Sequence, residues 1–425
     1  MRILLTGASG FVGTRLAQAL LAQGHDLVCA VRSPRAGNDP RLAWIAADFT
    51  KDIDKSTWLA RLGGVEIVIN TVGIFRERGP NTFQALHVDA PRALFSACAE
   101  SGVRLVIQMS ALGADGHAST AYHLSKKAAD DYLAQLPLRS YIVQPSLIYG
   151  SGASARFFKM IASMPFTFRF GTAPQLVQPV HVDDVVAAIC ALVREQLPFD
   201  GATSRKVPLT GPVSMPFVDY LAALRRALGM GRLRVLALPD AVARIAAKAA
   251  RFMPGSFFDD AALRMLDRGN TADPALTASL LGRPPRGVDT FIIEPAAESA
   301  RAKLDWLLPI LRLSVAAVWI ATAIVSAGLY PAEQSYALLA ATGIAAALHP
   351  LMLFGAAALD LAFGIGILVL RRRRALWLAQ AALIAFYTVV IAVRLPEFLL
   401  HPYGPLTKNL PMLAAIWLLY ECEER

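Results

Sequence analysis

The sequence has little cysteine and little charge. Its 425 residues include four widely scattered cysteines and no CxxC pair. A disulfide framework is therefore excluded, and we expect no metal site. Charged residues make up 17% of the chain, below the roughly 25% usual in soluble proteins. Hydrophobic residues reach 55% and the mean hydropathy is +0.45. These values exclude a disordered chain and argue against a fully soluble protein.

The charge is unevenly distributed along the chain. Of the 42 basic and 32 acidic residues, 8 and 7 lie in residues 305–425, which leaves 34 and 25 in residues 1–304. A basic part joined to an apolar part fits a protein at an anionic membrane surface. The basic part has no basic run with interleaved aromatics, so we expect no nucleic-acid partner. The apolar stretch after Met1 is too short for a signal peptide.

A glycine-rich turn near the start predicts a dinucleotide site. An apolar strand over residues 1–7 leads into Gly7-Ala-Ser-Gly10-Phe-Val-Gly13, and a helical pattern over 14–23 follows. Glycines let the backbone approach a pyrophosphate, while free amides and the helix dipole stabilise its charge. The glycine spacing alone is a weak signal, and the flanking strand and helix make it specific.

The end of the second strand indicates which cofactor is preferred. In NAD-binding sites an acidic residue there holds the ribose hydroxyls, but this strand, over 26–31, is followed by Arg32. A guanidinium suits a 2′-phosphate. We therefore expect NADP(H) to be preferred over NAD(H). The alternative is that Arg32 is an ordinary solvated arginine.

Strand and helix patterns then alternate, which predicts an α/β fold. The expected strands cover 42–47, 65–70 and 104–109, with helices over 56–62 and 83–100. Such alternation is typical of a Rossmann doubly wound parallel sheet, whose ligands lie at the carboxyl ends of the strands. The residues at or near those ends are Gly7, Arg32, Asp48, Asn70 and Ser110.

A serine, a tyrosine and a lysine form a candidate catalytic group. Ser110 follows the fifth strand, and Tyr122 and Lys126 have the i, i+4 spacing that places them on one helix face. The lysine cation can lower the tyrosine pKa, so that Tyr122 passes a proton to or from a carbonyl or alcohol oxygen held by Ser110. The alternative is a packing tyrosine and a solvated lysine.

Together these motifs resemble the short-chain dehydrogenase/reductase superfamily, in its extended and atypical branch, over about residues 1–295. Further matching segments are Gln144–Gly150 and Pro179–Asp184. The resemblance implies the catalytic residues Ser110, Tyr122 and Lys126. The expected cofactor-binding residues are Thr6, Gly7, Gly10, Phe11, Val12, Gly13, Arg32, Asp48, Asn70, Gly73, Lys126, Pro145 and Ser146.

Two features qualify the resemblance. The short gap between serine and tyrosine is similar to that in relatives of the NADPH-binding accessory subunit of respiratory complex I. Members of that branch can bind the nucleotide for structural reasons. Many extended members also carry an asparagine in the helix after strand four, where this chain has Ala85-Leu-His87-Val-Asp89. The sequence therefore leaves open whether catalysis occurs.

The apolar pattern of the last 121 residues predicts a membrane domain. Spans of about 20 apolar residues are expected at 313–332, 349–370 and 375–393, with a weaker fourth at 407–420. Residues 334–348 are too few for a span, and we expect them to be re-entrant or interfacial. Asp360, in the second span, is expected to face the bundle interior. The segment Leu400–Asn409 resembles the DoxX-like family, and four spans place Arg371–Arg374 in the cytoplasm.

The sequence thus predicts a Rossmann domain over 1–150, a small α/β substrate lobe over 151–304, and an all-α, four-helix transmembrane domain over 305–425. The expected function is that of a membrane-anchored, NADP(H)-dependent oxidoreductase acting on a carbonyl or alcohol of a small, apolar, lipid-soluble substrate. It would lie in the cell (inner) membrane, with the dinucleotide domain and C-terminus cytoplasmic. The alternatives are a sugar-nucleotide epimerase or dehydratase, and a nucleotide-binding scaffold for a membrane protein complex.

Overall fold

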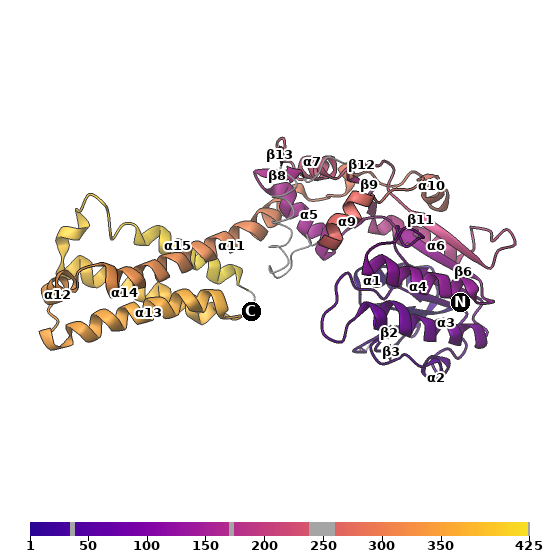
Figure 1. Ribbon diagram of the computed structural model, residues 1–425, viewed down its shortest axis with the longest axis horizontal. Coiled ribbons are helices and arrows are strands. Elements are labelled where there is room, and N and C mark those ends of the chain that lie inside the picture. The colour runs from indigo at the N-terminus through magenta and orange to yellow at the C-terminus, as the bar shows by residue number, and fades with distance from the viewer. Residues whose placement is uncertain (35–38, 170–173, 238–259, 424–425) are drawn as a thin grey trace. The chain divides into compact units, whose positions relative to one another are not determined.

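The computed structural model describes residues 1–34, 39–169, 174–237 and 260–423. The chain forms two compact units, Met1–Ala302 and Lys303–Arg425 (Figure 1). The first unit holds the expected Rossmann domain together with the expected substrate lobe. The second holds the apolar segments.

A seven-stranded parallel sheet forms the centre of the first unit, as predicted. Its strand order is β11-β6-β5-β4-β1-β2-β3, so the order reverses between β1 and β4, where doubly wound folds bind their ligands. The strands are β1 Arg2–Thr6, β2 Asp26–Val31, β3 Leu42–Ala46, β4 Ile67–Asn70, β5 Leu105–Met109, β6 Ser140–Pro145 and β11 Ser204–Leu209.

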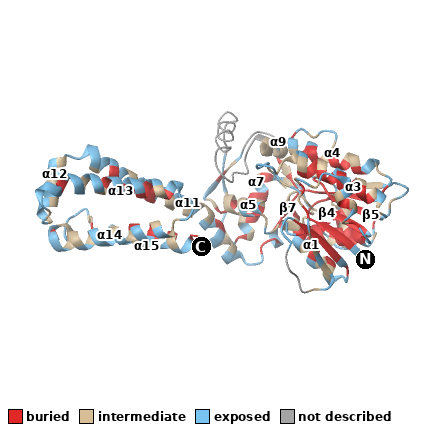
Figure 2. Ribbon diagram, turned by 90° about the horizontal axis from the view of Figure 1, so that it is seen from below, coloured by how far each residue is buried: buried red, intermediate tan, exposed pale blue. Residues whose placement is uncertain are grey.

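Helices cover both faces of this sheet, which is deeply buried (Figure 2). Because side chains alternate along a strand, Ile3 and Leu5 of β1 face one apolar cluster and Leu4 faces another. The first cluster draws on α1 Phe11–Ala22, α6 Val182–Val193 and α10 Ala275–Leu281. The second draws on α2 Lys55–Leu59, α3 Ala90–Glu100 and α4 Ala121–Gln135.

The helix predicted over 83–100 is not uniform. It begins as a π-helix, η1 Gln84–Asp89, and becomes α-helical only in α3. Pro91 lies in the first turn of α3 and has no amide hydrogen to donate to the preceding turn. The wider π turn therefore precedes the proline, and it contains His87.

The rest of the first unit is a smaller lobe with its own apolar cluster, in which Tyr149, Phe217 and Phe291 are buried. Its elements are β7 Ile148–Tyr149, α5 Ala153–Ser163, β8 Phe166–Arg169, β9 Leu176–Val177, β10 Val180–His181, β12 Met215–Pro216, α7 Phe217–Ala227, β13 Arg234–Ala237, α9 Asp260–Arg268 and η2 Val288–Thr290.

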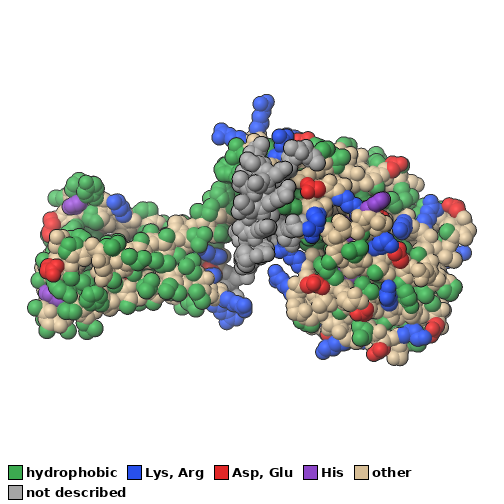
Figure 3. Space-filling view, viewed as in Figure 1, with side chains coloured by type: hydrophobic (Ala, Val, Ile, Leu, Met, Phe, Trp, Pro, Cys, Tyr) green, Lys and Arg blue, Asp and Glu red, His purple; other side chains and the backbone are tan. Residues whose placement is uncertain are grey.

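Three helices near the C-terminus are long and apolar enough to cross a membrane. They are α11 Pro295–Ile324, which continues as η3 Val325–Leu329, then α13 His349–Val369 with the preceding η4 Ala346–Leu348, and α14 Arg374–Arg394. Residues 334–348 do not form a further span, as expected, but fall mainly in α12 Ala332–Ala341 and η4. Hydrophobic side chains cover much of the visible surface of these helices (Figure 3).

The weaker fourth span, predicted over residues 407–420, is found as a short helix. After η5 Pro396–Leu399, helix α15 Asn409–Cys422 has 14 residues and a length of about 21 Å, less than the roughly 30 Å of a hydrocarbon core. It nevertheless shares one apolar core with α11, α13 and α14.

Two contacts show that α15 runs antiparallel to α14. At its start, Asn409 Nδ2 donates to Thr388 Oγ1 over 2.7 Å. At its end, the buried Glu423 carboxylate accepts from Arg373 and from Arg312, each over 3.1 Å. The end of the described chain therefore lies beside the arginine run.

Candidate functional site

In the loop between β1 and α1 and in the first turn of α1, two positions have room for glycine only. Gly7 has a φ of +72°, and a Cβ atom there would lie 2.8 Å from Thr71 Oγ1. A Cβ atom on Gly13 would lie 2.1 Å from the Gly7 carbonyl oxygen, which accepts from the Gly10 amide over 2.8 Å. No side chain caps α1 within the part of the chain that the structure describes. The amides of Phe11, Val12 and Gly13 are thus available to an anion, and this cradle fits a pyrophosphate.

A ladder of buried polar side chains supports the strand ends beneath this loop. Thr6 Oγ1 donates to Asn70 Oδ1 over 2.6 Å, and Asn70 Nδ2 donates to Gln108 Oε1 over 2.7 Å. Asn70 Oδ1 also accepts from the Val72 amide. Thr6 and Asn70, predicted to bind the cofactor, therefore use their side chains to join β1, β4 and β5. Sequence reasoning missed Gln108.

Two of the predicted cofactor-binding residues, Arg32 and Asp48, follow β2 and β3. Arg32 is exposed, whereas Asp48 is partly buried. Asp48 Oδ1 accepts from the Thr50 hydroxyl over 2.7 Å and from the Thr50 amide over 3.0 Å. The Thr50 hydroxyl has the largest part in holding the pKa of Asp48 below its usual range, with smaller contributions from the Thr50 amide and from the charges of Lys51 and Arg32. A cation and an anion thus flank this part of the sheet edge.

The amine of Lys126 lies at the carboxyl ends of β4 and β5. Nζ donates to Met109 O over 3.0 Å and to Val72 O over 3.4 Å, and the residue is 3% exposed. A Cβ atom on Gly73 would lie 3.0 Å from this amine, so Gly73 leaves space beside it. Tyr122 lies one turn earlier on α4, and its ring is 5.7 Å from that of His87. The structure therefore places the Lys126 amine at the end of β5, with Tyr122 one helical turn away on α4.

The electrostatics of this pair differ from the prediction. We expected the lysine cation to lower the pKa of Tyr122. Instead, burial raises the pKa of Tyr122 to about 12, and the nearby charge of Asp130 raises it further. Burial also lowers the pKa of Lys126 to about 8, which Asp130 opposes. Removal from water is thus the largest influence on the pKa of both groups.

Asp130 is a buried carboxylate that the sequence analysis overlooked. It lies on α4 one turn after Lys126, is fully buried, and accepts a hydrogen bond from the Ser110 hydroxyl. Burial raises its pKa to about 7, against the hydrogen bond from Ser110 and the charge of Lys126. Ser110 must therefore turn from this carboxylate before it can donate to a substrate oxygen. In the sequence, the i, i+4 spacing between Lys126 and Asp130 is the feature that could have indicated this carboxylate.

His87, at the departure from the family pattern, ties the loop after β4 to α4. Its Nε2 accepts from the Ile74 amide over 2.9 Å, so Nδ1 carries the proton and donates to Ser125 Oγ at 2.9 Å. Ser125 in turn donates to the Tyr122 carbonyl over 2.8 Å. Burial, with a smaller effect of the Lys126 charge, lowers the pKa of His87 to about 2, so the ring stays neutral.

Pro145 and Ser146 end β6 and are buried. The Pro145 carbonyl accepts from the Leu112 amide over 3.0 Å, which fixes the segment after Ser110. The Ser146 hydroxyl donates to the Gln178 carbonyl. These bonds connect the end of β6 to the segment after Ser110 and to the segment between β9 and β10.

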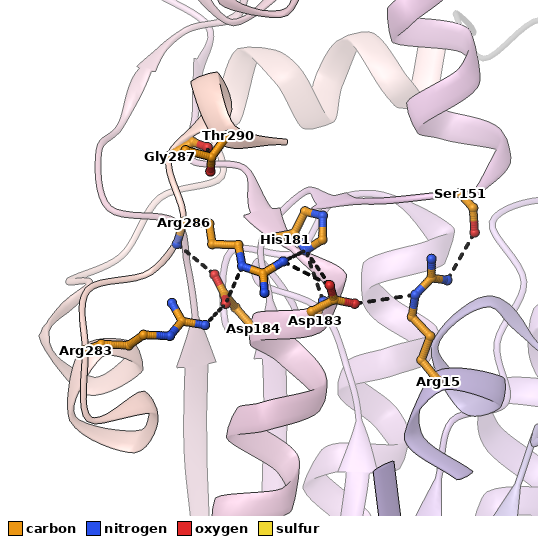
Figure 4. A network of polar contacts seen from close by, with 9 residues as sticks. All are labelled: Arg15, Ser151, His181, Asp183, Asp184, Arg283, Arg286, Gly287 and Thr290. Carbon is orange, nitrogen blue, oxygen red and sulfur yellow. Dashed lines mark hydrogen bonds and ion pairs between the residues drawn. The ribbon is translucent and has the colours of Figure 1, made fainter. Parts of the chain in front are cut away.

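An ion-pair network links α1 and α6 to the segment before η2 (Figure 4). The buried Asp184 accepts from Arg283 over 2.6 Å and from the Arg286 amide over 2.7 Å. Asp183 accepts from the Arg286 side chain over 2.9 Å and lies 3.5 Å from Arg15, which is on α1. Arg15 therefore ties α1 to the first turn of α6.

Each of the two parts of the chain matches a known protein family. Residues 3–200 match the NAD dependent epimerase/dehydratase family, and residues 316–417 match the DoxX-like family. Ceramide reductase of Caulobacter vibrioides is 28% identical over 199 residues, which cover 45% of this chain and 61% of the reductase. Subunit 9 of the mitochondrial NADH dehydrogenase (ubiquinone) 1 alpha subcomplex of Arabidopsis thaliana is 25% identical over 260 residues, with coverages of 58% and 62%. The chain spans less than two thirds of each relative.

Solved structures share the fold of the first unit. A nucleoside-diphosphate-sugar epimerase from Staphylococcus aureus has a TM-score of 0.55 at 16% identity and covers 69% of this chain and 100% of its own. MoeE5 in complex with UDP-glucuronic acid and NAD has a TM-score of 0.53 at 19% identity, with coverages of 71% and 100%. At these identities the likeness shows the fold alone.

Proposed function

We propose that this chain, which joins an NAD-dependent epimerase-type, short-chain dehydrogenase/reductase-like domain to a DoxX-like membrane-type region, is a membrane-anchored, NADP(H)-dependent oxidoreductase. Its substrate would be a carbonyl or alcohol of a small, apolar, lipid-soluble molecule. The apolar helices and the similarity to a ceramide reductase both favour a substrate of lipid type.

The position of Lys126 is the observation that carries the proposal. Its amine is buried at the carboxyl ends of β4 and β5, next to Gly73 and one turn from Tyr122. A buried cation at this place has no packing role that an apolar side chain would not fill at a lower desolvation cost. It can instead bind a ribose hydroxyl and stabilise a tyrosinate during proton transfer.

Each candidate residue then has a distinct task. A bound nicotinamide supplies or accepts the hydride. Tyr122 gives the proton to the substrate oxygen or takes it back, and its raised pKa makes it a weak acid that holds this proton until reaction. Ser110 orients the oxygen after its hydroxyl leaves Asp130. His87 holds the loop around Gly73 in place.

We assign the proposed preference for NADP(H) over NAD(H) to Arg32. Its exposed guanidinium follows β2, where it can pair with a 2′-phosphate, and Asp48 lies close enough for each charge to affect the other. The other proposed cofactor-binding groups are the glycine-loop amides, Gly73, Lys126, and Pro145 with Ser146. Thr6 and Asn70 act from beneath the loop.

The membrane arrangement follows from the arginine run. With Arg371–Arg374 in the cytoplasm, α13 enters from the opposite side and α14 returns to it. Glu423 lies beside Arg373, which favours a cytoplasmic C-terminus. We therefore place the protein in the cell (inner) membrane, with the dinucleotide domain also in the cytoplasm.

A second candidate function is a nucleotide-binding scaffold for a membrane protein complex. The similarity to a complex I subunit favours it, and in that role NADPH would be a structural ligand. An oxidoreductase needs the Tyr122 hydroxyl to transfer a proton, whereas a scaffold does not.

The experiment compares Tyr122→Phe with Tyr132→Phe in the full chain. Both changes keep the ring on α4, and Tyr132 loses only its hydroxyl contact with Ser96. The protein is purified in lipid nanodiscs, the bound nucleotide is identified by mass spectrometry, and oxidation of NADPH by a lipid extract is measured.

We expect Tyr122→Phe to retain NADPH and to lose activity by roughly 10²–10⁴-fold, and Tyr132→Phe to resemble wild type. Full activity of Tyr122→Phe would remove the tyrosine from the mechanism. NADPH binding by wild type without any lipid-dependent oxidation would favour the scaffold.

A further inference from the structure

Three polar side chains lie inside the apolar core of the second unit. Trp319 is on α11, Asp360 on α13 and Gln380 on α14, and they are 7%, 7% and 0% exposed. All three lie within helices long and apolar enough to cross a membrane. Polar residues at such positions are costly, so their burial together indicates a use for them.

Trp319 joins these helices at one level. Its indole Nε1 donates to Gln380 Oε1 over 3.0 Å, and its ring meets that of Phe363 edge-on, with centroids 5.1 Å apart. Asp360 lies three residues before Phe363, on the same face of α13. Asp360 is therefore within one helical turn of the place where Phe363 contacts the ring of Trp319, whose indole N–H bonds Gln380.

Two buried atoms at this level remain without a hydrogen-bond partner among residues 1–34, 39–169, 174–237 and 260–423. They are Oδ1 of Asp360 and Nε2 of Gln380, an acceptor and a donor. Thr322, on the neighbouring helix α11, donates to Val318 O within its own helix. The hydrocarbon core of a bilayer contains no water to form hydrogen bonds with such groups. Each polar group left without a partner there raises the free energy of the folded state.

We propose that Trp319, Asp360 and Gln380 form a binding site for the hydroxyl group of a neutral, long-chain alcohol within the membrane helices. A hydroxyl is the simplest group that donates one hydrogen bond and accepts another. It would donate to Asp360 Oδ1 and accept from Gln380 Nε2, and its hydrocarbon chain would lie against the apolar helices. This site does not depend on the proposed oxidoreductase activity.

The test uses the full chain in phosphatidylcholine nanodiscs and a long-chain primary alcohol that carries a diazirine and an alkyne. After illumination, labelled peptides are identified by mass spectrometry. We expect labelling at α13 and α14 that the unlabelled parent alcohol suppresses. The methyl ether of that alcohol has no hydroxyl proton to donate, and we expect it to compete at least tenfold more weakly. Equal competition by alcohol and ether would overturn the proposal.

Variants then test the named residues. Asp360→Leu and Gln380→Leu should each reduce specific labelling at least tenfold, whereas Asp360→Asn, which keeps an acceptor oxygen, should retain most of it. Thr322→Val is the matched control, because it removes a polar group from an exposed part of α11. Undiminished labelling of the leucine variants would refute the site. Should these variants fail to assemble, the alcohol-versus-ether comparison on wild type decides the matter alone.

Discussion

The buried carboxylate of Asp130 predicts a pH-dependent stability that one substitution removes. Asp130 is fully buried on α4, accepts from Ser110, and lies near the charges of Lys126, Lys206 and Asp131. Burial is the largest influence and raises its pKa from 3.8 to about 7. Asp130→Asn keeps an oxygen for the Ser110 hydroxyl but cannot ionise.

The sign of the effect follows from proton binding. Between about pH 4 and pH 7 the folded chain holds a proton on Asp130 that the unfolded chain has released. The stability from this group is complete below about pH 4 and is lost as the pH rises to about 7. A shift of roughly three pH units corresponds to at most about 4 kcal/mol. The Asp130→Asn variant lacks this loss, so its stability relative to wild type rises over the same range.

Hydrogen exchange of β5 and α4, measured by mass spectrometry on the full chain in nanodiscs, reports the local opening free energy. Across this pH range the difference between wild type and Asp130→Asn should change by up to about 4 kcal/mol. Asp131→Asn is the matched control, because its carboxylate is 44% exposed and pairs with Lys127 at the surface, a contact worth about 0.5 kcal/mol. A difference between wild type and Asp130→Asn that stays constant with pH would refute the reasoning.

Two further predictions concern the cofactor. Arg32→Ala should weaken NADPH binding by roughly tenfold or more, since a hydrogen bond to a charged group contributes about 1.5–3 kcal/mol, and should leave NADH binding nearly unchanged; equal losses for both in a fluorescence titration would contradict the assignment. Gly13→Ala should abolish binding of both nucleotides, because its methyl group would lie 2.1 Å from the Gly7 carbonyl oxygen, whereas Gly63→Ala, with nothing within 4 Å, should bind like wild type. Nucleotide binding by Gly13→Ala at wild-type affinity would show that the loop is not the phosphate site.

Periodicity was sufficient to predict the sheet and the long apolar helices. Strand β2 covers the predicted residues, and α14 covers the third predicted span with one arginine at each end. Such elements are set by local pattern, because a buried parallel strand reads as an apolar run. The π-helix η1 was missed because the effect of Pro91 on the preceding turn is not part of that pattern.

The polar partners of the site could not be predicted in the same way. The contacts of Ser110 with Asp130, and of Asn70 with Gln108, join residues that are 20 and 38 positions apart. Only the three-dimensional sheet brings them together. The pKa of Tyr122 was predicted in the wrong direction because sequence spacing shows a nearby cation but not the loss of water that accompanies burial.

We propose above that Tyr122 transfers the proton when hydride moves between a bound nicotinamide and a lipid. The most direct measurement incubates the full chain in nanodiscs with a lipid extract and NADPH that carries deuterium at nicotinamide C4, and then searches the lipids by mass spectrometry for the label on carbon. The account predicts a labelled lipid alcohol with wild type and with Tyr132→Phe, and little or none with Tyr122→Phe. Bound NADPH with no deuterium in any lipid, or equal labelling by Tyr122→Phe, would contradict it.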